Sequence, residues 1–265
     1  MSGQTLLRVD DVGHRFALPG GEDFWAVRHV GFELQRGEAL GLVGESGSGK
    51  STLGRMLLGL LDKTEGGVQF DGENLPRRYR RADFQRHARH MQMVFQDAYS
   101  TLNPRWTIGA SLAEPLHLLG DKRDIDARIA TALQRVGLSP ALAAHYPHEF
   151  SGGQRQRIGI ARALMTEPRL LICDEPVSAL DVSVQAQIIN LLVDLRRDLG
   201  LSLILISHDL AVVRHLCDRV AVMQRGAIVE IGDTERLYDS PQHEFTRKLL
   251  AARQVADPRL RDVGV

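Results

Sequence analysis

The chain has 265 residues, 43% of them hydrophobic and 25% charged, which is ordinary for a soluble globular protein and sufficient for a substantial core. Its 33 basic residues balance 33 acidic ones. A net charge of zero argues against binding to nucleic acid or anionic lipid that is driven by overall charge, but it does not exclude local charged patches. The two cysteines, Cys173 and Cys217, lack metal-type spacing, so we expect no disulfide framework and a reducing cytosol.

Short strands come first along the chain. Alternating segments within the first seventy residues, such as 27–37 and 66–75, predict antiparallel strands. The apolar run 39–44 ends in a Gly-rich turn and predicts a buried strand. Further buried strands are predicted at 90–96, 169–175 and 201–207, and such continuously apolar strands separated by helices predict a parallel sheet covered on both faces.

Helices are predicted between these strands. Apolar residues fall on one helical stripe in 125–136 and again in 184–195. Between residues 96 and 169 almost everything predicts helix or loop, so we expect a helical insertion in an α/β chain. The N-terminus lacks a charged-then-apolar signal design, so no signal peptide is expected. The longest apolar run near the C-terminal half, 203–206, is far shorter than the roughly 20 residues that cross a bilayer. Any membrane role is therefore expected to act through a partner.

Residues 44–51 match the phosphate-binding pattern G-x-x-x-x-G-K-[ST] between a predicted strand and a predicted helix. Glycines let backbone N–H groups converge on phosphate oxygens, and the helix N-terminus adds partial positive charge. Lys50 is expected to contact the β- and γ-phosphates, and Ser51 to ligate Mg²⁺. The candidate nucleotide-binding residues here are Gly44, Glu45, Ser46, Gly47, Ser48, Gly49, Lys50, Ser51 and Thr52.

Two carboxylates follow the strand predicted at 169–175. Asp174 ends that buried strand, where it can hold the Mg²⁺ shell. Glu175 would lie at the carboxyl edge of the sheet, where open α/β sheets bind ligands. There it could orient and deprotonate an attacking water, whereas without a P-loop an Asp-Glu pair would more often be a solvated turn.

A second glycine turn occurs at Ser151, Gly152, Gly153 and Gln154, before a helical run that reaches Leu164. Ser151 and Gln154 have the spacing of a capping box. A capped helix start with bare glycines is also a candidate anion site. Since the chain already has one phosphate loop, this turn would serve a different nucleotide.

The P-loop, the SGGQ turn and CDEPVSALD (173–181) together resemble the nucleotide-binding subunit of ABC transporters, from about residue 5 to 252. The resemblance implies a P-loop NTPase with a mixed core sheet, an N-terminal antiparallel β subdomain and a helical subdomain. It also implies ATP and Mg²⁺ as ligands. The ranges that this division predicts are a single ATPase domain at 1–240, with its core at about 1–96 and 167–240 and its helical subdomain at about 97–166, and a C-terminal tail at 241–265.

The same resemblance assigns further roles. Phe16 matches the aromatic that stacks on adenine, with Trp25 as a rival and core filling as the alternative for both. Gln96 matches the glutamine that touches Mg²⁺ and water and senses the membrane subunit. The turn ending at Asp181 communicates across a dimer, and His208 contacts the γ-phosphate. The resemblance implies that two subunits face head to tail, so that the SGGQ turn of one closes over the nucleotide of the other.

Several segments resemble the ATPases of oligopeptide, dipeptide and nickel importers, namely 94–116, 148–164, 175–192 and 240–252. In that group the membrane subunit inserts a coupling helix at Thr101–Leu118. The apolar residues Leu102, Trp106 and Ile108 there fit either a partner contact or local packing. Many members carry a cysteine-rich extension with an iron–sulfur cluster, but no cysteine follows Cys217, so we expect no cluster and treat Cys173 as a buried strand residue.

The resemblance implies an ATP-hydrolysing subunit that powers peptide uptake from the cytoplasmic face of the membrane. The alternatives are a nickel or other small-solute importer and a soluble, non-transport ABC ATPase. The implied partners are a second ATPase subunit (the same or a paralogous chain), two transmembrane permease subunits and, indirectly, an extracytoplasmic solute-binding protein, with no nucleic acid. Metal-compatible histidine pairs at 87/90 and 145/148 are expected to be solvated helix or loop residues.

Overall fold

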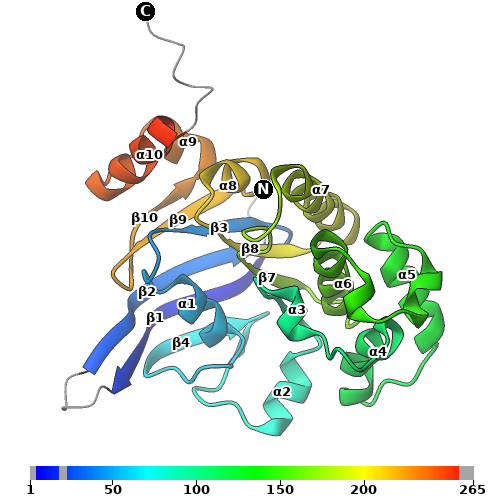
Figure 1. Ribbon diagram of the computed structural model, residues 1–265. Coiled ribbons are helices and arrows are strands. Elements are labelled where there is room, and N and C mark those ends of the chain that lie inside the picture. Colours follow the sequence, from blue (N-terminus) through cyan, green and yellow to red (C-terminus); the bar gives the residue numbers. More distant parts are fainter. Residues whose placement is uncertain (1–3, 18–22, 257–265) are drawn as a thin grey trace, which may run out of the picture.

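The computed structural model describes residues 4–17 and 23–256, and its strands form two sheets (Figure 1). The strands are β1 (Thr5–Ala17), β2 (Asp23–Gln35), β3 (Ala39–Val43), β4 (Glu65–Phe70), β5 (Glu73–Asn74), β6 (Met91–Val94), β7 (Leu170–Asp174), β8 (Ser202–Ile206), β9 (Arg219–Gln224) and β10 (Ala227–Asp233). The helices are α1 (Lys50–Leu57), α2 (Arg81–His87), α3 (Ala98–Thr101), α4 (Ile108–Leu118), α5 (Ile125–Arg135), α6 (Gly152–Leu164), α7 (Val182–Leu199), α8 (Leu210–Leu216), α9 (Thr234–Asp239) and α10 (Glu244–Ala256), with 3₁₀ turns η1 (Pro140–Ala144) and η2 (Pro147–Glu149). Within the described ranges, none of the helices combines the length and the apolar character that crossing a bilayer requires.

The core sheet has six strands in the order β10-β9-β3-β8-β7-β6. Strands β6, β7, β8, β3 and β9 run parallel, and β10 is antiparallel to β9. The four apolar runs predicted from the sequence are β3, β6, β7 and β8, so the predicted parallel sheet is confirmed. Each parallel pair needs a crossover connection, and helices provide several of them.

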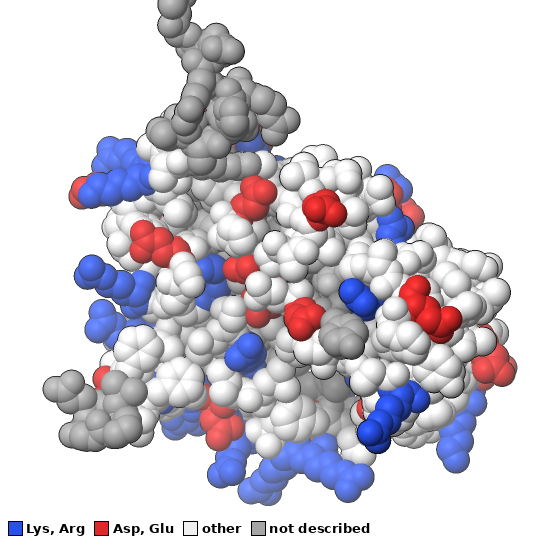
Figure 2. Space-filling model, viewed as in Figure 1, with Lys and Arg blue, Asp and Glu red and all other residues white. Residues whose placement is uncertain are grey.

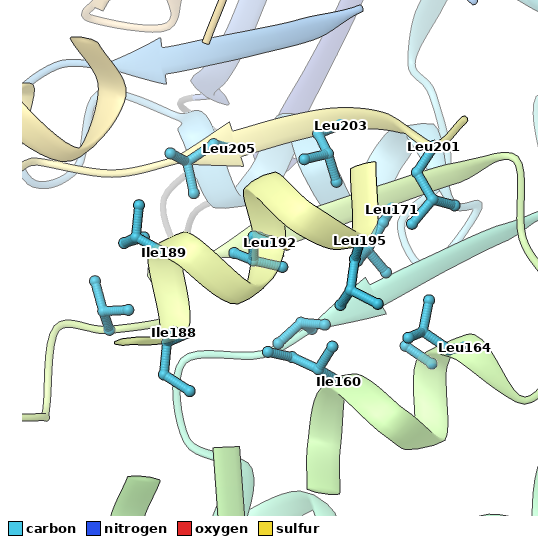
Figure 3. Packing of buried hydrophobic residues seen from close by; sticks show 14 of the residues in the cluster. Ile160, Leu164, Leu171, Ile188, Ile189, Leu192, Leu195, Leu201, Leu203 and Leu205 are labelled. Carbon is cyan, nitrogen blue, oxygen red and sulfur yellow. The ribbon is translucent and has the colours of Figure 1, made fainter. Parts of the chain in front are cut away.

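Both faces of this sheet are buried, because successive side chains of a strand point to opposite faces. Leu203 and Leu205 of β8 pack with α6 and α7 in one apolar cluster (Figure 3). Ile204 and Ile206 belong to a second cluster with α1 and the antiparallel sheet. The prediction of a sheet covered on both faces is therefore confirmed.

The antiparallel sheet has the order β2-β1-β4-β5 and contains the segments predicted at 27–37 and 66–75. Helix α1 lies on the same side of the core sheet, and its apolar residues share a cluster with those of β1, β2 and β4. The phosphate loop between β3 and α1 is thus held between the two sheets. Figure 1 shows α1 beside the strands of both.

Helices α3 to α6 occupy the chain between β6 and β7, as the helical insertion predicted, and lie to the right of the sheet in Figure 1. The stripe at 125–136 is on α5, and that at 184–195 is on α7. Leu102 and Ile108 are buried, so local packing explains them, whereas Trp106 is 40% exposed. Cys173 is a buried strand residue, as expected.

Candidate nucleotide site

The loop between β3 and α1 can adopt its path only with glycine at two positions. Gly44 has φ 153°, and a Cβ there would lie 2.2 Å from the carbonyl oxygen of Met223. Gly49 has φ 102°, and its Cβ would lie 2.2 Å from the carbonyl oxygen of Ala26. Both the backbone conformation and the close approach exclude side chains. The loop leads into the first turn of α1, where helix N–H groups lack intrahelical partners and favour an anion.

Lys50 is the first residue of α1, and its buried side chain reaches back into this loop. Its ammonium donates hydrogen bonds to the carbonyl oxygens of Gly44 at 2.9 Å and Glu45 at 2.8 Å. Burial lowers the pKa of Lys50, and the carboxylates of Glu175 and Asp174 act in the opposite direction. The Lys50 ammonium is therefore held by two backbone carbonyl groups and lies close to two acids. From this position it can also contact a phosphate bound on the loop.

Asp174 and Ser51 join β7 to α1 across the site. The Ser51 hydroxyl donates to Oδ1 of Asp174 at 2.8 Å. Burial raises the pKa of Asp174, and the hydrogen bond from Ser51 partly opposes that shift. A buried carboxylate that is only partly compensated favours a nearby cation. A hydroxyl and a carboxylate at hydrogen-bond distance are the oxygen donors that Mg²⁺ prefers, so this pair fits the ion.

Glu175 occupies a constrained position one residue beyond Asp174. Its backbone has φ 48°, and its N–H donates to the carbonyl oxygen of Ile206 at 2.9 Å. A non-glycine residue in the left-handed region costs on the order of 1–3 kcal/mol, so the surrounding structure must impose it. Oε2 of Glu175 lies 3.3 Å from Nδ1 of His208, whose side chain is largely exposed. The carboxylate is thus aimed by backbone and side-chain partners at the sheet edge.

The SGGQ turn forms the N-terminus of α6. The Gln154 N–H donates to the Ser151 hydroxyl at 3.3 Å, and the Ser151 N–H donates to Oε1 of Gln154 at 3.0 Å, so the predicted capping box is confirmed. A Cβ on Gly153 would lie 2.4 Å from Cγ1 of Val184. The turn therefore packs on the start of α7, whose N-cap is Asp181. In the part of the chain that the structure describes, no hydrogen bond joins Ser151 to Lys50.

Gln96 and Phe16 make no described contact with Ser51 or Asp174. Gln96 is exposed and follows β6, which pairs with β7 in parallel, so it leaves the same sheet edge as Asp174. Phe16 is 40% exposed near the end of β1 and packs edge-on against His14 at 4.5 Å between ring centroids. The structure thus brings together Lys50, Ser51, Asp174, Glu175 and His208, and leaves the turn at Ser151, Gly152, Gly153 and Gln154 outside that cluster.

A second exposed aromatic residue, not predicted from the sequence, lies beside Phe16. Phe24 is 51% exposed and lies directly opposite Phe16 in the β1–β2 pair. Trp25 lies opposite Arg15 and is half-buried, with the guanidinium 6.0 Å from its ring centroid. Because neighbouring residues of a strand face opposite sides, Phe24 shares a face with Phe16 and Trp25 does not. Strand alternation, applied to both strands at once, would have identified Phe24 as a rival.

A groove of about 630 Å³ lies between α2, α4 and α6 and was not predicted. Residues that line it include Arg81, Phe84, Phe95, Pro115, Leu118 and Arg162. We call it the α2–α4 groove. The predicted coupling segment Thr101–Leu118 supplies one wall through α4. His87, beside the groove, is buried edge-on against Tyr79, so the expectation that it is solvated was wrong.

Comparisons with known proteins bear on this geometry. A family model described as ABC transporter matches residues 27–178. The chain is 51% identical over 266 residues to the glutathione import ATP-binding protein GsiA of Escherichia coli (strain K12), covering 97% of this chain and 42% of that protein. GsiA of Pectobacterium atrosepticum is 48% identical with the same coverage. The chain therefore spans about two fifths of the length of these relatives.

Solved structures show the same fold. Clostridium perfringens cbiO1, part of the ABC transporter complex cbiONQ, superposes with a TM-score of 0.80 at 27% identity, covering 97% of each chain. The dimeric post-hydrolysis state of the ATP-binding cassette MJ0796, bound to ADP and Pi, superposes with a TM-score of 0.77 at 27% identity, covering 86% of this chain and 99% of that one. The mixed core sheet, the antiparallel sheet and the helical part predicted from the sequence are those of this fold.

Proposed function

The chain belongs to the ABC transporter family, and from that membership we propose that it is the ATP-hydrolysing subunit of an importer that takes up peptides. One observation carries the proposal: Lys50, Ser51, Asp174 and Glu175 assemble at one sheet edge around a glycine loop. The names of the glutathione import relatives support a peptide-like cargo. A nickel or other small-solute importer and a soluble ABC ATPase are the alternatives.

In the proposed reaction, ATP binds with its phosphates on the loop 44–51. Lys50 turns from the carbonyl oxygens of Gly44 and Glu45 toward the β- and γ-phosphates. Glu175 orients an attacking water and accepts its proton, and His208 and Lys50 stabilise charge that develops on the γ-phosphoryl group. The position of Glu175 at the sheet edge, 3.3 Å from His208, supports these roles.

Ser51 and Asp174 would hold Mg²⁺, with Gln96 as a third candidate donor from the end of β6. When bound, the ion would neutralise phosphate charge and help to align the terminal phosphate. The hydrogen bond from Ser51 to Asp174 and the raised pKa of Asp174 support this assignment. Phe16 would stack on the adenine ring, since its exposed ring lies near the end of β1.

We propose that the SGGQ turn serves a facing cassette, either a second copy or a paralogous chain. The turn is capped and packed on Val184, yet lies outside the Lys50 cluster. The dimeric cassette bound to ADP and Pi supports this arrangement. A site completed by a partner makes ATP favour the closed pair, and hydrolysis then removes that bias. We assign residues 1–240 to one ATPase domain, with its core at about 1–96 and 167–240 and a helical subdomain at about 97–166, followed by a tail.

The α2–α4 groove is proposed to receive a helix from a transmembrane permease, one of two in the assembly. Its volume of about 630 Å³ suits part of a helix, and Thr101–Leu118 forms one wall. Closure of the paired cassettes would move this wall and so drive the permease. The chain would therefore reside on the cytoplasmic face of the membrane, and an extracytoplasmic solute-binding protein would deliver the cargo.

The test is reconstitution with the permease chains that co-purify from native membranes. We expect ATPase activity that rises with permease and Mg²⁺, and ATP-dependent uptake of labelled glutathione or dipeptides into vesicles. Uptake of ⁶³Ni²⁺ without peptide uptake would instead favour the nickel alternative. ATPase activity that no membrane subunit alters would favour a soluble ABC ATPase.

A further inference from the structure

The chain is neutral overall, but its positive charge is concentrated at α2 and the turn before it. Residues 77–89 contain six arginines and one acidic residue, Asp83. Figure 2 shows blue side chains along the lower edge of the molecule, where Figure 1 places α2. We call this surface, formed by Arg77, Arg78, Arg80, Arg81, Arg86 and Arg89, the arginine ridge.

The ridge is displayed by a buried anchor rather than by a mobile tail. Tyr79, in the middle of the run, is buried. Its ring packs on Gly59, where a Cβ would lie 2.3 Å from the ring, and Gly59 has φ 71°. Because Tyr79 points inward, the residues on either side of it, Arg77, Arg78 and Arg80, are exposed.

Lys63 holds the turn at 76–80 through its backbone and its side chain. Its ammonium donates to the carbonyl oxygen of Pro76 at 2.6 Å, and its N–H donates to the carbonyl oxygen of Arg77 at 3.1 Å. The same ammonium lies 5.6 Å from the centroid of the Tyr79 ring. A buried lysine and a buried tyrosine therefore hold the backbone that carries these arginines in place, which lowers the entropy cost of binding a charged surface.

Half of the ridge arginines have an acidic partner within the chain, since Arg78, Arg86 and Arg89 each form an ion pair. Across residues 4–17 and 23–256, Arg77 and Arg80 form no ion pair. Arg78 lies 3.6 Å from Asp62, but its side chain is 86% exposed, and such surface pairs contribute little. The exposed part of the ridge before α2, at Arg77, Arg78 and Arg80, is therefore available to an anionic partner.

Exposed apolar residues lie beside the ridge. Leu60 is 49% exposed and Leu118 is 68% exposed. Leu60 lines a small pocket together with Tyr79 and Phe84, and Leu118 lines the α2–α4 groove together with Arg81. Arginine side chains beside exposed leucines suit a membrane surface, where headgroups bind the charges and the interface takes up the apolar tips.

We infer that the arginine ridge binds anionic phospholipid headgroups of the membrane that holds the permease. The inference rests on the proposed function, because the α2–α4 groove, whose wall includes α2, would face that membrane. The ridge then adds a second attachment and fixes the tilt of the subunit under its permease. Since net charge is zero, the attraction is local and weakens with salt.

The test uses the full chain and vesicles without any permease. The purified protein is sedimented with phosphatidylcholine vesicles that do or do not contain phosphatidylglycerol, at low and at physiological salt. We expect binding only with phosphatidylglycerol. The triple variant R77Q/R78Q/R80Q should bind about 10²-fold more weakly, at about five-fold per arginine.

A control with the same charge change separates location from net charge. Arg135, Arg236 and Arg247 are exposed residues on α5, α9 and α10, away from α2 (Figure 1). R135Q/R236Q/R247Q should bind like the unaltered chain. Thermal unfolding should show that both variants are folded, and ATPase activity without vesicles should be unchanged in both.

The inference is overturned by equal binding of both triple variants, by equal binding to vesicles without phosphatidylglycerol, or by no vesicle binding at low salt. It is also overturned if crosslinks from the ridge in the assembled transporter reach an acidic protein segment instead of lipid. Failure of the proposed function has a different signature. In that case vesicle binding through the ridge would persist while permease chains neither bind the α2–α4 groove nor alter ATP hydrolysis.

Discussion

Nδ1 of His208 lies 3.3 Å from Oε2 of Glu175 and so joins the residues that follow two neighbouring parallel strands, β8 and β7. The backbone reinforces this contact, because the Glu175 N–H donates to the carbonyl oxygen of Ile206, the last residue of β8. Glu175 is therefore oriented from two directions. A carboxylate held in one orientation can position a water molecule for attack, a role that a merely charge-neutralising group would not require.

Replacement of Glu175 by Gln tests its role as the base. The amide preserves size but cannot accept a proton, so turnover should fall about 10²–10⁴-fold. ATP binding should persist, and a stable ATP-bound dimer should accumulate because hydrolysis no longer opens it. Single-turnover hydrolysis and size-exclusion chromatography with ATP measure these effects. Glu167→Gln, at an exposed position, is the control and should leave both readouts unchanged.

Measurements of nucleotide affinity test whether Phe16 stacks on the adenine ring. Stacking of a base on an aromatic ring contributes about 1–3 kcal/mol, so Phe16→Ala should raise the Kd for ATP about 5- to 150-fold. Phe24→Ala removes an exposed ring opposite Phe16 and serves as the matched comparison. Fluorescence titration with a labelled ATP analogue gives both values. A larger loss in Phe24→Ala would transfer the stacking role to Phe24.

Most of the core sheet and the phosphate loop could be predicted from the sequence, because the patterns that indicate them lie within short segments of the chain. Strands such as β8 are continuous apolar runs, and the P-loop has a fixed spacing between a strand and a helix. Other features depend on tertiary contacts. Phe24 becomes a candidate only through its pairing with Phe16, and His87 is buried against the ring of Tyr79, which lies in a different local segment of the chain. The α2–α4 groove combines segments far apart in the chain, so no single segment indicates it.

Ser151→Ala separates a structural role of the SGGQ turn from a catalytic one. Loss of the cap hydrogen bond from Gln154 should lower the free energy of unfolding by about 1 kcal/mol. If the hydroxyl also contacts nucleotide in a facing cassette, steady-state ATPase activity should fall at least about ten-fold at temperatures where the variant is folded. Ser139→Ala removes a comparable cap from η1 and should lower stability without changing turnover. Equal activity of the two variants would limit Ser151 to its structural role.

Lys63 makes stability depend on pH. Burial lowers its pKa from 10.5 to about 8. Between these values the unfolded chain holds more protons than the folded one, so the free energy of unfolding rises with pH, by at most about 1.4 kcal/mol per pH unit. Below pH 8 the lysine is charged in both the folded and the unfolded chain. The cost of burying its charge then lowers the free energy of unfolding in full.

Lys63→Met removes this pH-dependent contribution. Urea unfolding at pH 7, 8, 9 and 10 should show that the difference in unfolding free energy, unaltered chain minus variant, increases with pH above 8. Lys122→Met, at an exposed position, should give a difference that does not change with pH. A flat difference for Lys63→Met would mean that its amine titrates as it does in water.

Gly153→Ala tests the packing of the SGGQ turn on α7. Alanine favours a helix over glycine by about 1 kcal/mol, but the new Cβ would lie 2.4 Å from Cγ1 of Val184. Overpacking costs about 1–3 kcal/mol, and the stiff β-branched side chain of Val184 cannot rotate away freely. We therefore expect a net loss of stability in Gly153→Ala. In the double variant Gly153→Ala/Val184→Ala the clash is gone and the helix gain remains, so the double variant should be less destabilised than the two single variants combined. Urea unfolding of all four proteins measures this coupling, and strict additivity would show that the turn is not seated on Val184.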